Sequence, residues 1–361
     1  MNKWNSPKMF ISWKIYLPIL VGFIVLFSLI LVHIGPPAGT AQSPQEVLSN
    51  PGTFHPYQIP SISDCSPSSI SSPPTLSAAA SSDSTIALVE TPSCPYAPSS
   101  LVESSDGGKS FVQMSDRLPN FDFAEMVYDP NLGFVIFGDY KDYQCYCQGG
   151  NQEIGMWNFE NGTITQMLFP AAYYLELPAL AYNSLQDSLY LFGGTTFYSG
   201  SSNQIWILNS GIWTSTDLKI APSPRFASAM TCPPTEKFCV LFGGANCLYY
   251  DYVIQDHMCL FLTDTWIFDG ENWNQIQTQT NPGELFNPII TSSPDGKIYL
   301  YGGLTNTKVE SQNLWEFDSS SLNWDNVAVA SSSANIEQIV SFGNQIYGCV
   351  SSSQVSCLVI H

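Results

Sequence analysis

The sequence predicts an all-β fold in which similar small sheets follow one another, placed after a single membrane-spanning segment. The chain of 361 residues is 44% hydrophobic and 13% aromatic but only 11% charged, so it can bury a large core. Strands that end in an aromatic residue and glycine recur about every 50 residues. Short apolar runs broken by Gly, Pro, Asn and Asp fill the rest of this region, as expected for strands and turns.

The first element is an apolar N-terminal stretch. Residues 15–34 carry no charged side chain, and a helix of that length spans the roughly 30 Å of hydrocarbon in a membrane. Three lysines and no acid precede it, so residues 1–14 are expected in the cytoplasm as a basic tail and everything after the span outside the cell. Because the stretch exceeds a signal-peptide core, we expect a retained, single-pass anchor in the cell membrane. Cleavage near residues 39–41 is the alternative.

A proline- and serine-rich stretch follows the predicted anchor. Residues 35–74 contain nine prolines and nine serines and few bulky apolar residues, a composition typical of a stalk. The remaining residues, 75–361, form the predicted repeat domain.

Four units of this domain share one spacing of glycine and tryptophan. Glycines at the end of a strand permit a positive φ where the chain turns sharply, and tryptophans at fixed offsets fill the space between neighbouring wedge-shaped sheets. Periods near 50 with four strands a unit predict small sheets repeated around a ring. The glycines are Gly138, Gly193, Gly243 and Gly302; the tryptophans that follow are Trp157, Trp206, Trp266 and Trp315, with Trp213, Trp273 and Trp324 as second tryptophans.

The repeat resembles the kelch motif. Its clearest unit contains residues 224–226 (Pro-Arg-Phe) and 242–244 (Phe-Gly-Gly), followed by Trp266 and Trp273. The resemblance covers residues 120–330 and implies a β-propeller of four-stranded blades, similar to the central domain of galactose oxidase.

Two flanking stretches supply further blades, so six blades are expected, with five or seven left open. Residues 75–118 include a turn at 104–111 that resembles an Asp-box, in which Asp106 bonds its own loop. Residues 336–360 supply three more strands, and a strand from near residue 55 would complete that last blade and cover its edge.

Ten cysteines fit an oxidising compartment. Their positions suggest two bridges across hairpins, one at the base of the longest loop, and one between the stalk and the first blade. These pairs are Cys232–Cys239, Cys349–Cys357, Cys247–Cys259 and Cys65–Cys94.

The scarcity of histidine argues against a metal site. The remaining pair, Cys145 and Cys147, has thiolates that copper(I) or zinc would select, but two separate disulfide halves or a strained local bridge in an oxidised loop are favoured over a metal site. The copper site of galactose oxidase needs two histidines, whereas only His257 lies well inside the repeats. We expect no metal and no cofactor.

Charge excludes one class of partner and suggests an environment. The net charge of −19 leaves no cluster of cations for phosphate, so we expect no nucleic-acid partner. An excess of acids over lysines predicts tolerance of acidic surroundings, because protonation would leave the surface nearly neutral.

The connections after the glycine-ended strands emerge on one face and contain the candidate ligand-binding residues. Tyrosines offer rigid contact area, carboxylates orient polar groups, and a cation-poor surface suits neutral ligands such as sugars. Alternatively, these tyrosines pack inside their own loops. The connections are residues 139–155, 195–204, 245–263 and 304–313, and the candidates are Tyr140, Asp142, Tyr143, Tyr198, Tyr249, Tyr250, Asp251, Tyr252 and His257.

The sequence therefore favours a binding module over an enzyme. We expect a membrane-anchored extracellular propeller that contacts a glycan or an exported protein through its long aromatic loops. The alternative is a glycoside hydrolase with an Asp/Glu pair near the propeller axis, for which the sequence identifies no catalytic residues. A third possibility is a structural component of the cell envelope.

Overall fold

The computed structural model describes most of the repeat domain and one short piece of the chain near its N-terminus. The predicted membrane span at 15–34, the stalk at 35–74 and nearly all of the basic tail at 1–14 lie outside the described residues. Within the described part, no helix is long and apolar enough to cross a membrane. The described residues are 10–11 and 75–361, except 83, 93–97, 143–150, 161–162, 168, 170–174, 197–199, 217, 252–255, 328–335 and 352–354.

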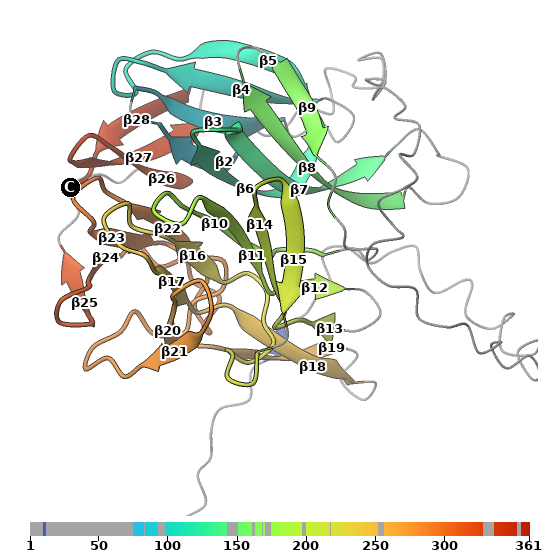
Figure 1. Cartoon of the computed structure of the whole chain (residues 1–361), viewed down its shortest axis with the longest axis vertical. Helices are drawn as coiled ribbons and strands as arrows, with labels where there is room; N and C mark the ends of the chain where they lie inside the picture. Colours follow the sequence, from blue (N-terminus) through green and yellow to red (C-terminus); the bar gives the residue numbers. More distant parts are fainter. Residues whose placement is uncertain are drawn as a thin grey trace, which may run out of the picture.

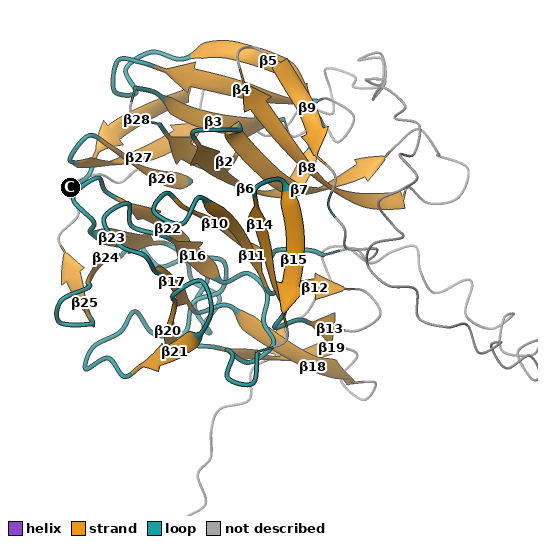
Figure 2. Ribbon diagram, viewed as in Figure 1, coloured by secondary structure: helices purple, strands orange, loops and turns teal. Residues whose placement is uncertain are grey.

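Every regular element in these residues is a β-strand, and the strands form the six blades of a propeller (Figures 1 and 2). Blade 1 contains β2 (Thr75–Ser81), β3 (Ile86–Thr91), β4 (Ser99–Ser104) and β5 (Val112–Leu118). Blade 2 contains β6 (Phe121–Asp129), β7 (Gly133–Asp142), β8 (Asn151–Glu160) and β9 (Thr163–Met167). Blade 3 contains β10 (Ala179–Asn183), β11 (Ser188–Phe192), β14 (Ile205–Asn209) and β15 (Ile212–Thr216).

The other three blades complete the ring. Blade 4 contains β16 (Ala229–Thr231), β17 (Cys239–Phe242), β20 (Thr265–Phe268) and β21 (Trp273–Ile276). Blade 5 contains β22 (Ile289–Ser292), β23 (Ile298–Tyr301), β24 (Leu314–Asp318) and β25 (Asn323–Val327). Blade 6 shows three strands among the described residues, namely β26 (Gln338–Phe342), β27 (Gln345–Ser351) and β28 (Val355–Val359). The strand predicted from near residue 55 lies outside them.

Additional short strands lie in the connections. β12 (Thr195–Thr196) pairs with β13 (Gly200–Ser201), and β18 (Ala245–Asp251) pairs with β19 (Asp256–Phe261). β1 (Phe10–Ile11), near the N-terminus, pairs with β19. The predicted topology, with residues 1–14 in the cytoplasm and the repeats outside the cell, does not account for this pairing.

The first strand of each blade surrounds the propeller axis. These inner strands contact one another in the order β2, β6, β10, β16, β22, β26 and back to β2. The six-bladed ring, predicted from the four glycine- and tryptophan-containing units and the two flanking stretches, is therefore confirmed.

Apolar clusters between successive blades hold the ring together, and the predicted tryptophans lie in them. Trp157 packs with residues of blade 1, and Trp266 packs with residues of blade 3. The indole of Trp324 lies 5.4 Å from the ring of Phe242 in blade 4, and its Nε1 donates a hydrogen bond of 2.9 Å to Thr265 Oγ1 of that blade. The tryptophans thus fill the wedge between neighbouring sheets.

Blades 1 and 6 meet along what we term the closure seam. The Leu76 amide donates to Glu337 Oε2 at 2.7 Å, and Gln338 Nε2 donates to the Leu76 carbonyl at 3.3 Å. Side chains from both blades form one apolar cluster beneath these bonds. The seam joins residues 261 positions apart in the chain. Its cluster comprises Leu76, Ile86, Leu88, Val102, Val340, Tyr347, Cys349 and Cys357.

The Asp-box turn adds to this seam. Asp106 accepts hydrogen bonds from the Ser110 hydroxyl and amide, from the Ser104 hydroxyl and from the Lys109 amide, and these bonds hold the pKa of its carboxyl well below the usual range. The turn so formed brings the Gly108 carbonyl to the Cys357 amide, which donates to it at 3.3 Å. A structural role for the turn, as predicted, is confirmed.

Three of the four predicted disulfides are present: Cys232–Cys239, Cys247–Cys259 and Cys349–Cys357. The first and third cross hairpins of blades 4 and 6. The fourth prediction, Cys65–Cys94, lies outside the described residues, as does the pair Cys145 and Cys147.

Truncating Trp324 tests the packing between blades. Because its side chain is fully buried between blades 4 and 5, Trp324→Ala should lower the free energy of unfolding by about 4 kcal/mol. Chemical denaturation of the purified protein measures this loss. Ile212→Ala, at a 63% exposed position on β15, is the control and should change stability by less than about 0.5 kcal/mol. Equal effects of the two substitutions would contradict the inter-blade role.

Candidate functional site

The predicted loop face exists because glycine pairs let the chain pass close to the entry of the next blade. A Cβ at Gly243, which has a φ of +67°, would lie 3.0 Å from the Leu285 carbonyl oxygen at the entry to blade 5. The next residue, Gly244, has a φ of +88°, and a Cβ there would lie 2.7 Å from the Phe226 carbonyl oxygen in the entry of its own blade. Its amide donates to the Leu285 carbonyl at 3.0 Å, at the entry to blade 5. In the preceding unit, the Gly194 amide donates to the Arg225 carbonyl at 2.9 Å. Each glycine pair therefore fixes where the following blade begins.

Three residues at equivalent positions in successive blade entries link those entries to one another through backbone hydrogen bonds. Leu177, Ala227 and Asn287 have φ values of 51°, 52° and 53°, in the left-handed region that side chains other than glycine rarely adopt. The Ala227 amide donates to the Leu177 carbonyl at 2.8 Å, and the Asn287 amide donates to the Ala227 carbonyl at 2.9 Å. These bonds offset the strain and link the entries of blades 3, 4 and 5 directly.

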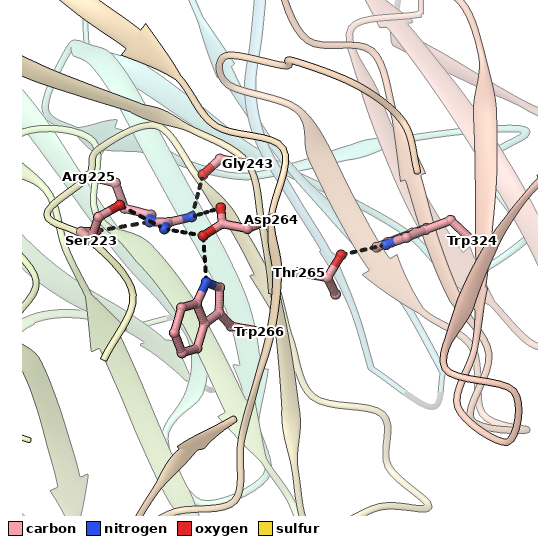
Figure 3. Close-up of polar contacts among 7 residues, drawn as sticks. All are labelled: Ser223, Arg225, Gly243, Asp264, Thr265, Trp266 and Trp324. Carbon is pink, nitrogen blue, oxygen red and sulfur yellow. Dashed lines mark hydrogen bonds and ion pairs between the residues drawn. The ribbon is translucent and has the colours of Figure 1, made fainter. Parts of the chain in front are cut away.

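A buried ion pair holds the entry to blade 4 (Figure 3). Arg225 is fully buried, and its guanidinium donates to both carboxylate oxygens of Asp264, at 2.7 and 2.8 Å, and to the Gly243 carbonyl at 3.1 Å. Trp266 Nε1 donates to the same carboxylate. Burial opposes ionisation of Asp264, but the hydrogen bonds and charge of Arg225 outweigh it and hold the pKa of Asp264 below its ordinary value.

The longest connection forms a hairpin of β18 and β19 that is anchored at its base. The Cys247–Cys259 disulfide joins the two strands, and the Cys247 amide donates to Ser201 Oγ of the neighbouring β13 at 3.3 Å. Beneath the hairpin, the ring of Phe261 stacks on Phe286 at 5.8 Å. The hairpin base is thus fixed to the body of the propeller and to the adjacent hairpin.

The hairpins that contain the candidate residues extend from the same side of the molecule. In Figure 1, the outer ends of β7 and β8 and the hairpins β12–β13 and β18–β19 all point towards the right. Of the candidates, six lie on described strands, although their side chains fall outside the described part of the structure, and three lie outside the described residues altogether. The first group is Tyr140, Asp142, Tyr249, Tyr250, Asp251 and His257; the second is Tyr143, Tyr198 and Tyr252.

A central cavity of about 1130 Å³ runs between the six inner strands. Its wall includes alanines and larger apolar side chains from several blades, with hydroxyl groups from every blade. The propeller axis is where the alternative enzyme hypothesis places a carboxylate pair. Among the described residues, three carboxyl residues line the cavity: Glu125, Glu310 and Glu337.

Glu125 is the most perturbed of these carboxyls, and sequence reasoning did not find it. It lies in the middle of β6 and is half-buried, and burial raises its pKa to about 8. A usable signal was present, because an acid interrupts an otherwise apolar part of the inner strand Phe121–Asp129. Arg225 was noted only as part of the repeat, and its pairing with Asp264 could not be seen from spacing alone.

Replacing Arg225 tests the role of the buried ion pair. Arg225→Met leaves the Asp264 carboxylate without its cation and should lower the free energy of unfolding by about 3 kcal/mol at pH 7. The loss should shrink as the pH falls through the lowered pKa of Asp264, because the protonated acid no longer needs the cation. Thermal and chemical unfolding at several pH values measure both effects.

The exposed pair of Lys297 and Glu316 provides the control for Arg225. Lys297→Met should cost less than about 1 kcal/mol. If Arg225→Met lowers the free energy of unfolding no more than Lys297→Met does, the buried pair does not hold the blade entry.

The raised pKa of Glu125 predicts that the folded protein is more stable in acid than at alkaline pH. Its folded pKa lies near 8, above the ordinary value of 4.5, so the folded chain retains a proton that the unfolded chain has released. This contribution is fully present below pH 4.5 and is lost as the pH rises through 8. Relative to Glu125→Gln, which cannot ionise, the native protein should lose about 4 kcal/mol of stability between about pH 5 and about pH 9. Parallel stability curves for the two proteins would contradict a raised pKa.

Comparison with known proteins agrees with this architecture. No curated protein matches the chain. A family model described as the KLHDC2/KLHL20/DRC7 Kelch-repeats domain matches residues 134–347, which is more than half of the sequence. Together with the six blades, the glycine-ended strands and the inter-blade tryptophans, this match shows that the chain belongs to the kelch-repeat propeller family.

Proposed function

We propose that this chain is a membrane-anchored, extracellular binding module that contacts a glycan or an exported protein through its loop face. A kelch propeller points to an interaction module, and the fold supplies the rigid body that such a module needs. The anchor at residues 15–34 and the location outside the cell rest on hydropathy and charge in the sequence. The observation that carries the proposal is the group of long hairpins on one side of the propeller.

The anchoring of these hairpins supports recognition. Loops that are fixed before binding lose less conformational freedom when a partner arrives, so their contact residues bind more tightly. The Cys247–Cys259 disulfide and the stack of Phe261 on Phe286 fix the base of the β18–β19 hairpin. Tyr249 and Tyr250 lie on β18 beyond this base.

The negative net charge of the repeat domain restricts the class of partner that it can bind. Residues 75–361 contain eight Lys and Arg against 28 Asp and Glu, so anionic partners are repelled. Neutral glycans and exported proteins with neutral or basic surfaces are compatible with this charge. Aromatic rings stack on the C–H faces of sugars, and Asp142 and Asp251 would accept hydrogen bonds from hydroxyl groups.

One specific observation favours the alternative function, that of an enzyme. Glu125, whose pKa is raised to about 8, lines the central cavity and has the protonation state of a general acid at neutral pH. A glycoside hydrolase would need a second carboxylate at a suitable separation. A glycosidase assay run beside a glycan-array screen separates the two functions. Turnover that Glu125→Gln abolishes would support the enzyme, whereas glycan binding without turnover would support the binding module.

Removing the tyrosines of the β18–β19 hairpin tests the binding proposal. The combined replacement of Tyr249, Tyr250 and Tyr252 by alanine should reduce glycan-array or cell-surface binding at least about tenfold, with a melting temperature within about 2 °C of the native protein. Ile212→Ala and Ile220→Ala, which remove exposed apolar side chains elsewhere, are the control and should leave binding unchanged. Retained binding with a large loss of stability would instead show that the tyrosines pack within their loop.

A further inference from the structure

The charged residues that line the central cavity all have the same sign. Its carboxyl residues are Glu125, Glu310 and Glu337, and the described lining contains no lysine, arginine or histidine. A buried carboxylate requires a cation or several hydrogen-bond donors, or it takes up a proton. No cation in the described lining therefore neutralises these carboxyls, so the cavity favours a positively charged ligand. The binding function proposed for the loop face does not involve this cavity.

Two of these carboxyls are accounted for by other contacts or by solvent. Glu337 accepts hydrogen bonds from the Leu76 amide at 2.7 Å and from the Ser351 amide at 3.3 Å, so it belongs to the closure seam. Glu310 is exposed at the loop-face end of the cavity, where it pairs with Leu304 in an isolated bridge. Neither needs an additional ligand.

Glu125 differs from both. Burial is the one cause of its pKa shift, with no contribution from a hydrogen bond or a neighbouring charge in the described part of the chain. On β6 it alternates with Ala124 and Met126, which pack against blade 1, so its side chain projects on the opposite side of the strand. The proton that it holds at neutral pH is what a cation would replace.

Apolar side chains lie on the same side of β6 as Glu125. Phe123 and Val127 are two positions before and after it on the strand, and both line the cavity. Phe123 is 46% exposed although it lies on an inner strand. An alkyl chain would bury apolar surface against these side chains. A ligand that fits both features carries a positive charge at one end and a hydrocarbon chain at the other.

We propose that the central cavity binds a protonated aliphatic amine, with Glu125 as its counter-ion and the apolar wall in contact with its alkyl chain. On binding, the Glu125 carboxyl releases its proton to solvent, and the ammonium group pairs with the resulting carboxylate. A free alkylamine and a lysine side chain of a polypeptide share this chemistry.

Isothermal titration calorimetry with n-hexylammonium chloride tests the proposal on the full-length protein. Titrations at about pH 7 in two buffers of different ionisation enthalpy should show close to one proton released for each amine bound. Affinity should increase at least about tenfold from about pH 6 to about pH 9, because the carboxylate becomes populated while the amine, with a pKa near 10, remains charged. The uncharged probe 1-hexanol should bind at least about tenfold more weakly at the higher pH.

Matched variants identify the counter-ion. Glu125→Gln should reduce hexylammonium affinity at least about tenfold at about pH 9 and abolish proton release, whereas Glu310→Gln should change affinity less than about threefold. Thermal unfolding checks that each variant folds. If Glu125→Gln does not fold, the proton release and the pH dependence of affinity measured on the native protein test the proposal instead. Equal binding of amine and alcohol, unchanged affinity in Glu125→Gln, or no heat with millimolar amine would overturn the proposal.

A second pair of probes distinguishes the source of the amine. Nα-acetyl-lysine amide should bind as hexylammonium does if the cavity takes a lysine side chain, and its Nε-acetylated form should not bind. Binding of hexylammonium alone would assign the cavity to small free amines. The loop-face tyrosine variants should bind hexylammonium normally, so failure of this inference is distinguishable from failure of the proposed binding function.

Discussion

The contact between blades 1 and 6 is the constraint on which the rest of the structure depends. An open row of blades would leave an apolar face of each terminal sheet in water, and the chain avoids this by packing β2 against β26. The Leu76 amide and the Glu337 carboxylate meet there across 261 positions of sequence. The central cavity exists only when this contact closes, because all six inner strands are needed to line it.

The loop face follows from backbone geometry at the blade entries. Gly243 and Gly193 allow the chain to approach the next entry without a clash, and the left-handed residues Ala227 and Asn287 donate to the entries before them. Arg225 fills the space beside the blade 4 entry and forms a bidentate ion pair with Asp264 there. The long hairpins therefore emerge from a fixed framework, which is the property a recognition surface requires.

Much of the architecture could be predicted from the sequence because the signals are periodic. The glycine and tryptophan spacing indicated four blades, and the flanking stretches indicated the first and last ones. Two disulfides followed from cysteines on either side of hairpin turns, and a third followed from cysteines at the base of the longest loop. The acid within the apolar strand β6 was a signal for Glu125, but its burial at the axis depends on how the sheets pack. The Arg225–Asp264 pair could not be predicted, because it joins residues 39 positions apart. The tyrosine candidates remain predictions, as do the anchor and the stalk.

Hydrogen exchange followed by mass spectrometry tests ring closure most directly. In the full-length protein, peptides that cover β2 and β26 to β28 should exchange as slowly as peptides from β16 and β17, because a closed ring opens only when the whole propeller unfolds. Rapid exchange in blades 1 and 6, with slow exchange in blades 3 and 4, would show that the ring is open at the seam and would contradict the closed propeller.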